Sequence, residues 1–240
     1  MGILLFILAV FPGLFLSWYI WWRDKHEREP HKYLIACFVF GLLSVFPALL
    51  LEETGSYLGF GISRDTFSTF IFAVCVVGFS EEFSKFLFLR FYIFPKKEFC
   101  EPMDGIVYSV IVSMGFATFE NVLYVFHAEH GGIETALMRM ILSVPAHASF
   151  AVLMGYFVGL AKFSDKNKFL KLCIGLLSAT IIHGLFDFFL FQKLHSSLMI
   201  FTLVTFVIAI ITSRYMIHWH VENSPHNNGE DKDIADHLLK

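Results

Sequence analysis

Long apolar stretches dominate the pattern of hydrophobic and polar positions along the chain. A helix that crosses the hydrocarbon core of a bilayer needs about 20 mostly apolar residues. The stretches are too long and too continuous for barrel strands, and helices satisfy their own backbone groups in lipid. The pattern therefore predicts an all-α fold, a polytopic transmembrane helix bundle of about seven spans. The predicted spans are residues 2–22, 33–51, 66–90, 104–127, 135–162, 169–191 and 197–217.

The same pattern sets the expected domain organisation. Neither an internal repeat nor an interdomain linker interrupts the apolar stretches. We expect residues 1–217 to form a single transmembrane domain whose polar site comes from spans three to six. Residues 218–240 are polar, His-rich and acidic, which favours a flexible cytoplasmic tail.

Lys and Arg are distributed unevenly among the connecting loops. The first, third and fifth loops are rich in basic residues, whereas the second, fourth and sixth hold few. Cytoplasmic loops carry the excess of positive charge in membrane proteins. The alternation predicts an N-terminus outside and a C-terminus in the cytoplasm. Nothing basic precedes the first span, so we interpret it as a retained span and not as a signal peptide.

Composition strengthens the membrane interpretation and removes several classes of function. Hydrophobic residues make up 56% of the 240 residues, and charged residues only 16%; an ordinary soluble domain has about 25% charged residues. So much apolar surface excludes a soluble globular protein and a disordered chain. The net charge of −3 gives no basic face for nucleic acid, so the expected surroundings are a lipid bilayer.

The third span carries ionisable residues inside its apolar run. A charge at mid-bilayer costs ~2.5–3.5 kcal/mol on insertion scales, so such residues are functional candidates. Glu81 and Lys85 are four positions apart and share a helix face, whereas Glu82 points about 100° away. One Lys fully neutralises only one carboxylate, so desolvation and like-charge repulsion leave the other either protonated or poised as a base. An ion pair at a helix end is the structural alternative, and the apolar residues after Lys85 weaken it.

Spans four and five each contribute one polar group. Glu120 and Asn121 are adjacent in span four, where a Glu–Asn pair can simply lock neighbouring helices. His147 lies in span five, and taken alone it is more often a hydrogen-bonded packing residue. Pro145 can open the local helix beside it.

Span six contains His183 and Asp187, which are four positions apart on one helix face. A carboxylate beside an imidazole fixes its tautomer and orientation, although the pair can also serve as an interhelical clip. Asp104, at the start of span four, is better explained as a helix cap.

The depths of these groups in the membrane provide a further test. With alternating spans, Glu81, Glu82, His147 and His183 fall at similar middle depths. Glu120 of span four falls somewhat nearer the outside, so four helices can point polar groups at one wet cavity. A carboxylate and two imidazoles are the parts of a water-activating site. Proton-coupled transporters use the same residue types, so the pattern alone does not decide the function.

Four motifs, in this order, resemble the PrsW family of bacterial membrane proteases, which is grouped with CAAX prenyl proteases and bacteriocin-processing enzymes. The resemblance covers roughly residues 80–190. The matching motifs are Glu81-Glu82-x-x-Lys85, Gly115-Phe116-Ala117-x-x-x-Glu120-Asn121-Val122-Leu123-Tyr124, Val144-Pro145-x-His147 and His183-Gly184-x-x-Asp187.

The resemblance implies an intramembrane endopeptidase of glutamic type in the bacterial cytoplasmic membrane. Its substrate would be a single-span membrane protein such as an anti-sigma factor, cut at site 1 in a stress response. Glu81 would be the general base that activates water, and Glu82 would assist it. His147 and His183 would polarise the scissile carbonyl. The supporting residues would be Lys85, Glu120, Asn121 and Asp187, with Asp187 orienting His183.

Two alternatives remain open at this point. The expected enzyme has no cofactor, but zinc is possible, with Glu81, His147 and His183 as its ligands in a membrane metalloprotease. The other alternative is a non-protease, either an ion-coupled transporter or a scaffold. The absence of repeat symmetry counts mildly against a transporter built from inverted repeats.

Overall fold

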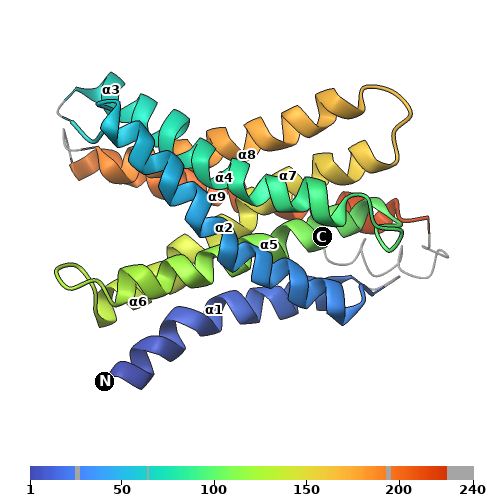
Figure 1. The fold of residues 1–240 in the computed structure, drawn as a ribbon, viewed down its shortest axis with the longest axis horizontal. Helices are drawn as coiled ribbons and strands as arrows, with labels where there is room; N and C mark the ends of the chain where they lie inside the picture. The colour runs from blue at the N-terminus through green and yellow to red at the C-terminus, as the bar shows by residue number, and fades with distance from the viewer. Residues whose placement is uncertain (25–27, 64, 193–195, 226–240) are drawn as a thin grey trace.

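The computed structural model describes residues 1–24, 28–63, 65–192 and 196–225, and all regular elements in these ranges are helical (Figure 1). The elements are α1 (Gly2–Arg23), α2 (His31–Tyr57), α3 (Thr66–Ile71), η1 (Phe72–Gly78), α4 (Phe79–Phe88), η2 (Leu89–Ile93), α5 (Pro102–Val125), α6 (Ile133–Met138), η3 (Arg139–Ser143), α7 (Val144–Lys162), α8 (Lys168–Phe191), η4 (Ser196–Met199) and α9 (Ile200–Glu222).

Several of these elements join end to end into longer rods. α3, η1, α4 and η2 follow one another without a break, as do α6, η3 and α7. The described residues thus form seven helical rods, as the hydrophobic pattern predicts, and six helices are long and apolar enough to cross a membrane. The rod over residues 66–93 is not among those six, and it carries Glu81, Glu82 and Lys85. The chain is a multi-pass membrane protein.

The second span is longer than its apolar run. α2 continues to Tyr57, whereas the sequence places Glu52 and the residues after it in a loop. Glu is a good helix former and does not stop a helix that is already propagating. The helix ends just before Gly59, which has a φ of +93°, a left-handed conformation that suits glycine beyond a helix C-terminus.

α5 is the centre of the bundle. Of its most apolar window, 78% is buried, compared with 22% for α1 and 22% for the segment that contains α9. Close backbone contact holds α5 to α7: a Cβ on Gly105 would lie 2.5 Å from the Gly155 carbonyl oxygen and 2.7 Å from Gly159 Cα. Small residues allow this approach between transmembrane helices, and it fixes the relative position of the site residues on both helices.

A similar contact positions the rod that carries the paired glutamates. A Cβ on Gly184 of α8 would lie only 2.5 Å from Val74 Cα. Val74 lies in η1, a π-helical segment directly before α4. π-helical turns change the facing of the residues that follow and occur frequently at functional sites. The contact therefore sets α4 against α8 at the level where their polar side chains meet.

The C-terminal helix extends beyond the predicted domain boundary. α9 continues past Ile217 to Glu222, and His220 near its end is buried. The other tail residues that the structure describes reach position 225. Residues 226–240, the larger part of the predicted flexible tail, lie outside the described residues, so the domain division stays a prediction.

Candidate active site

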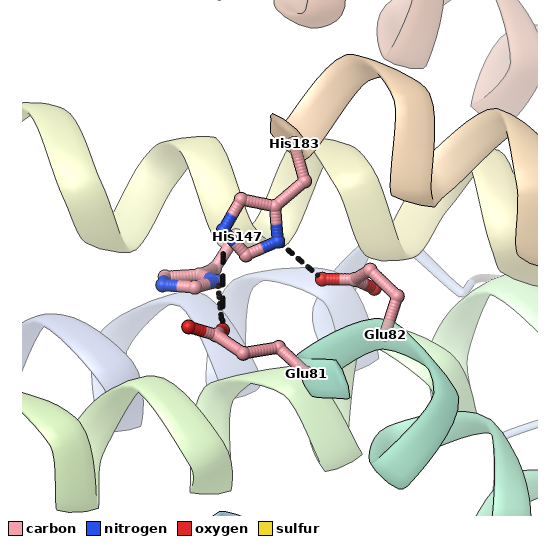
Figure 2. A group of neighbouring side chains, drawn as sticks. All are labelled: Glu81, Glu82, His147 and His183. Carbon is pink, nitrogen blue, oxygen red and sulfur yellow. Dashed lines mark hydrogen bonds and ion pairs between the residues drawn. The ribbon is translucent and has the colours of Figure 1, made fainter. Parts of the chain in front are cut away.

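Two glutamates and two histidines from three helices converge inside the bundle (Figure 2). Glu81 and Glu82 lie on α4, His147 on the first turn of α7, and His183 on α8. All four are buried, and Glu82 is fully buried. One nitrogen or oxygen atom of each lies within 4.8 Å of the others. The structure thus brings together the residues that share a depth in the sequence-based assignment of spans.

Lys85 compensates the charge of both glutamates. Its Nζ donates to Glu82 Oε1 at 2.8 Å and to Glu81 Oε2 at 3.2 Å. The predicted pair of Glu81 and Lys85 is present, and Glu82 adds a second, shorter contact. Residues three and four positions before Lys85 both lie within reach of its flexible side chain. The ammonium also lies 4.0 Å from the centroid of the Phe116 ring, a cation–π contact that adds to its stabilisation.

His183 lies between two carboxylates. Its Nδ1 is 2.9 Å from Glu82 Oε1, and its Nε2 is 3.2 Å from Asp187 Oδ2 and 3.9 Å from Glu81 Oε2. Asp187 and Glu82 therefore fix the plane of the imidazole from both sides. The Phe150 ring stacks on His183 with a centroid separation of 4.8 Å, which restricts its rotation further.

His147 has a defined pattern of donors and acceptors. Its Nδ1 is 3.3 Å from Lys85 Nζ, and its Nε2 is 2.9 Å from Glu120 Oε2. An ammonium group can only donate, so Nδ1 of His147 accepts and Nε2 carries the proton that is donated to Glu120. Glu120 thereby sets the tautomer of His147.

Arg139 is the residue at this site that the sequence analysis misses. Its Nη2 lies 2.8 Å from Glu120 Oε2, and its guanidinium carbon is 4.2 Å from the centroid of the Tyr124 ring. Arg139 begins η3, which follows α6 directly. In the sequence it lies near the start of the predicted span 135–162 and looks like an ordinary basic residue close to a helix end, and only the carboxylate of Glu120, one helix earlier, would have marked it.

Asn121 has a different role from its neighbour Glu120. Its Nδ2 donates to the Ala9 carbonyl of α1, and its Oδ1 accepts from Arg139 Nε at 2.7 Å. The amide therefore connects α1, α5 and η3. This is the helix-locking role that the sequence offers as an alternative for the Glu–Asn pair. Asp104 is likewise a cap: its Oδ2 accepts from the Glu101 backbone N–H at 2.9 Å.

A cavity of about 170 Å³ opens beside the polar cluster. Glu81, Glu120, His147, His183 and Asp187 line it, whereas Glu82 and Lys85 are not among its lining residues. The adjacent glutamates therefore differ: Glu81 faces the cavity, and Glu82 lies behind it against Lys85 and His183. The remaining wall is mainly apolar, with side chains that include Met138, Leu142, Phe186 and Leu190.

Comparison with known proteins assigns this arrangement to a family. The model of the PrsW family intramembrane metalloproteases matches residues 29–213, which includes every residue of the cluster. The chain belongs to the PrsW family of intramembrane proteases.

Curated PrsW proteases resemble this chain over most of its length. Protease PrsW of Geobacillus kaustophilus is 37% identical over 77% of this chain and 79% of its own length. Protease PrsW of Bacillus subtilis is 34% identical over 76% and 80%, and that of Clostridioides difficile is 35% identical over 78% and 79%. No solved structure matches the chain.

The description of the PrsW family as metalloproteases raises the question of whether the cluster fits a metal ion. Zinc binds imidazole nitrogen and carboxylate oxygen, usually with three protein ligands at a catalytic site. Glu81, Glu82, His147 and His183 supply these donor types within one buried group. The Nδ1 of His147 has a lone pair, and its Nε2 faces Glu120 at 2.9 Å. A carboxylate on the far nitrogen is typical of metal-binding histidines, so the residues fit zinc by their chemistry.

Proposed function

We propose that this chain hydrolyses a peptide bond of a membrane-anchored protein, with Glu81 as the general base that activates water. The observation that carries the proposal is the position of Glu81. It is the one of the two adjacent carboxylates that lines the cavity, and its Oε2 lies 4.0 Å from His147 Nδ1 and 3.9 Å from His183 Nε2. Membership of a protease family favours hydrolysis over the transporter and scaffold alternatives.

These residues can carry out both steps of peptide-bond hydrolysis, the attack of water and the release of the amine. Glu81 takes one proton from a water molecule while the oxygen of that water bonds to the scissile carbonyl carbon. The π electrons of the carbonyl move to the carbonyl oxygen. When the carbonyl re-forms, the C–N bond breaks and Glu81 returns the proton to the leaving nitrogen. Both imidazoles have a carboxylate partner at Nε2. We assign the donor to the oxyanion to His183, because its Nε2 is 3.2 Å from Asp187, a longer contact than the 2.9 Å between His147 Nε2 and Glu120. A positioned donor of this kind supplies about 3–4 kcal/mol.

Four further residues position these groups in the proposal. Asp187 and Glu82 orient His183 through its two ring nitrogens. Lys85 balances the charge of both glutamates. Glu120 orients His147. None of these four needs to touch the scissile bond.

A metal-dependent form is the second candidate, and the contact between His147 and Glu120 favours it. Glu81, His147 and His183 would hold zinc, and Glu120 would orient His147 from behind. Bound zinc supplies an acidified water and polarises a carbonyl. In this form the Lys85 ammonium would need to move away from Nδ1 of His147, because zinc and the ammonium would compete for the same nitrogen lone pair.

The proposed substrate is a single-span membrane protein, such as an anti-sigma factor that is cut at site 1 in a stress response. The mainly apolar wall of the cavity suits a segment that lies in or next to the bilayer. Relatives named as proteases in several bacteria support a bacterial cytoplasmic membrane as the location.

A paired cleavage assay in proteoliposomes tests the function. Wild type, Glu81→Gln and the exposed control Glu53→Gln would be compared on a panel of single-span substrates, with and without chelator. We expect cleavage by wild type and by Glu53→Gln, and none by Glu81→Gln. Full activity of Glu81→Gln would remove Glu81 as the base.

The chelator arm separates the two forms of the mechanism. Cleavage that is indifferent to chelator supports water activated by glutamate alone. Cleavage that is lost on chelation, together with one bound zinc per chain that Glu81→Gln fails to retain, moves Glu81 into the metal-ligand set.

The proposed topology, with the N-terminus outside and the C-terminus in the cytoplasm, has its own test. A reporter fused within residues 129–134, which span the end of the connection after α5 and the first residues of α6, should give an extracytoplasmic signal. A cytoplasmic signal there would invert the orientation.

A further inference from the structure

A second group of buried carboxylates lies at the opposite end of α5 from Glu120. Asp24 follows α1, Glu29 precedes α2, Glu101 caps α5, and Asp104 lies on its first turn. We call these four residues the end cluster. All four are buried, with exposed fractions of 1%, 4%, 1% and 0%. Ligand atoms of Asp24, Glu101 and Asp104 lie within 4.8 Å of one another.

One oxygen of each of three carboxylates is held by a hydrogen bond from the surrounding helices. The Tyr108 hydroxyl donates to Glu29 Oε2, and the Ser224 hydroxyl donates to Glu101 Oε2. Asp104 Oδ2 accepts from the backbone N–H of Cys100 at 2.6 Å and from that of Glu101 at 2.9 Å. These bonds orient the carboxylates of the end cluster.

The second oxygen of the same three carboxylates has no hydrogen-bond partner among the described residues. These oxygens are Glu29 Oε1, Glu101 Oε1 and Asp104 Oδ1, and all three are shielded from solvent. Buried polar atoms in folded proteins are nearly always satisfied, so each exception needs an explanation. Lys162, whose charge acts on Asp104, uses its ammonium to donate to the carbonyls of Phe94 and Lys96.

We infer that the end cluster is a binding site for a hard divalent cation, Ca²⁺ or Mg²⁺. Both ions prefer carboxylate oxygens as ligands, and Ca²⁺ takes six to eight of them from carboxylates, carbonyls and water. Among the described residues, the group of ligand atoms at this end contains only carboxylate oxygens, without the imidazole or thiolate that zinc favours. Three buried oxygens without donors, on side chains already fixed in place, are suited to such an ion.

The site is separate from the candidate active site. Asp104 and Glu120 lie 16 residues apart on α5, which at about 1.5 Å per residue is about 24 Å. The cation would connect the end of α1, the start of α2 and the start of α5, and Ser224 would extend this connection to the end of α9. We therefore expect it to stabilise the packing of the helix ends and to leave the chemistry at Glu81 unaffected.

A proton on Glu29 is the competing way to relieve the repulsion. Burial, followed by the nearby charge of Asp104, raises the pKa of the Glu29 carboxyl to about 10. A neutral Glu29 would remove one charge and would donate a hydrogen bond to Asp104, without any metal. The two explanations differ in their response to cations, which makes them distinguishable.

The test measures cation binding on the full-length protein in detergent after treatment with chelator. CaCl₂, MgCl₂ and ZnCl₂ are added separately, and thermal unfolding and bound metal are followed. We expect about one equivalent of Ca²⁺ or Mg²⁺, with a rise of about 5 °C in the unfolding midpoint at a hundred-fold excess over Kd. The cation with the larger shift at equal concentration is the occupant.

Matched variants locate the effect. Glu29→Gln and Asp104→Asn keep the side-chain volume and the orienting hydrogen-bond acceptor, and both should lose the shift with Ca²⁺ and Mg²⁺. Asp165→Asn, an exposed acid in the loop between α7 and α8, should keep it. Equal shifts in all variants, a response of wild type to zinc alone, or no response of wild type to any cation would each overturn the proposal. The wild-type arm decides even if a variant fails to fold.

Discussion

The two buried groups of carboxylates in this bundle balance their charge differently. At the candidate active site, Lys85 contacts both Glu81 and Glu82, and two imidazoles complete the set. For Glu29, Glu101 and Asp104 of the end cluster, the described hydrogen-bond donors are hydroxyls and backbone N–H groups, which carry no charge. The difference teaches that buried acids can serve opposite purposes. One group has its positive charge within the chain and faces a cavity. The other has buried oxygens without a hydrogen-bond partner on Glu29, Glu101 and Asp104, which in our proposal bind an external cation.

The largest expected effect comes from removing the internal cation. Lys85→Met leaves two buried carboxylates without their partner, and breaking a buried pair costs roughly 3–5 kcal/mol. We expect a large fall in unfolding free energy together with loss of cleavage, measured by chemical denaturation in detergent and by the proteoliposome assay. Lys97→Met, at an exposed position, is the control. An unchanged stability of Lys85→Met would show that the charge balance at this site does not depend on Lys85.

The two adjacent glutamates should separate chemistry from positioning. A general base contributes about 10²–10⁴-fold to the rate, so we expect Glu81→Gln to lose kcat on that scale and to stay folded. Glu82→Gln keeps a hydrogen-bonding group beside His183 and should lose only about 10–100-fold, as outer-shell partners do. Single-turnover cleavage measures both variants. A larger loss in Glu82→Gln than in Glu81→Gln would reverse their assigned roles.

Arg139 should affect the active site through Glu120. Arg139→Leu removes the guanidinium that lies 2.8 Å from Glu120 Oε2 and frees Glu120 to reorient His147. We expect a loss of about 10–100-fold in kcat with little change in KM, and partial recovery in Arg139→Lys. A change in KM alone would instead make Arg139 a substrate-binding residue.

The end cluster should show the smallest effect, and it should appear in stability alone. Tyr108→Phe removes the hydroxyl that donates to Glu29 Oε2. The cost of leaving such a group unsatisfied is about 1–3 kcal/mol. We expect a lower unfolding midpoint and unchanged cleavage per folded molecule. A loss of kcat in this variant would mean that the two ends of α5 are coupled.

The fold and much of the candidate site follow from the sequence because their signals are local. Seven apolar runs mark the helical rods, and helix spacing places His183 and Asp187 on one face. The position of Glu81, Glu82, His147 and His183 follows from counting depth along alternating spans. These inferences need only the length of a span and the direction of the chain.

The remaining features depend on contacts between segments that are distant in the sequence. Arg139 looks like a basic residue near the end of a span until Glu120 is placed beside it. Each member of the end cluster has a plausible local explanation; Asp104, for example, caps α5. The division of labour between Glu81 and Glu82 depends on η1 and on the contact of Gly184 with Val74, which no periodicity reveals.

The glycine contacts along α5 also determine how a long substrate can reach the cavity. At Gly105, Gly155 and Gly159 the backbones of α5 and α7 touch, and at Gly41 and Gly115 those of α2 and α5 touch. These helix–helix contacts leave no room for a substrate segment to pass between the helices. Met138 and Leu190 line the cavity and are half-exposed on the outside of the bundle. We expect a membrane-embedded polypeptide to reach the cavity sideways from the lipid along this edge.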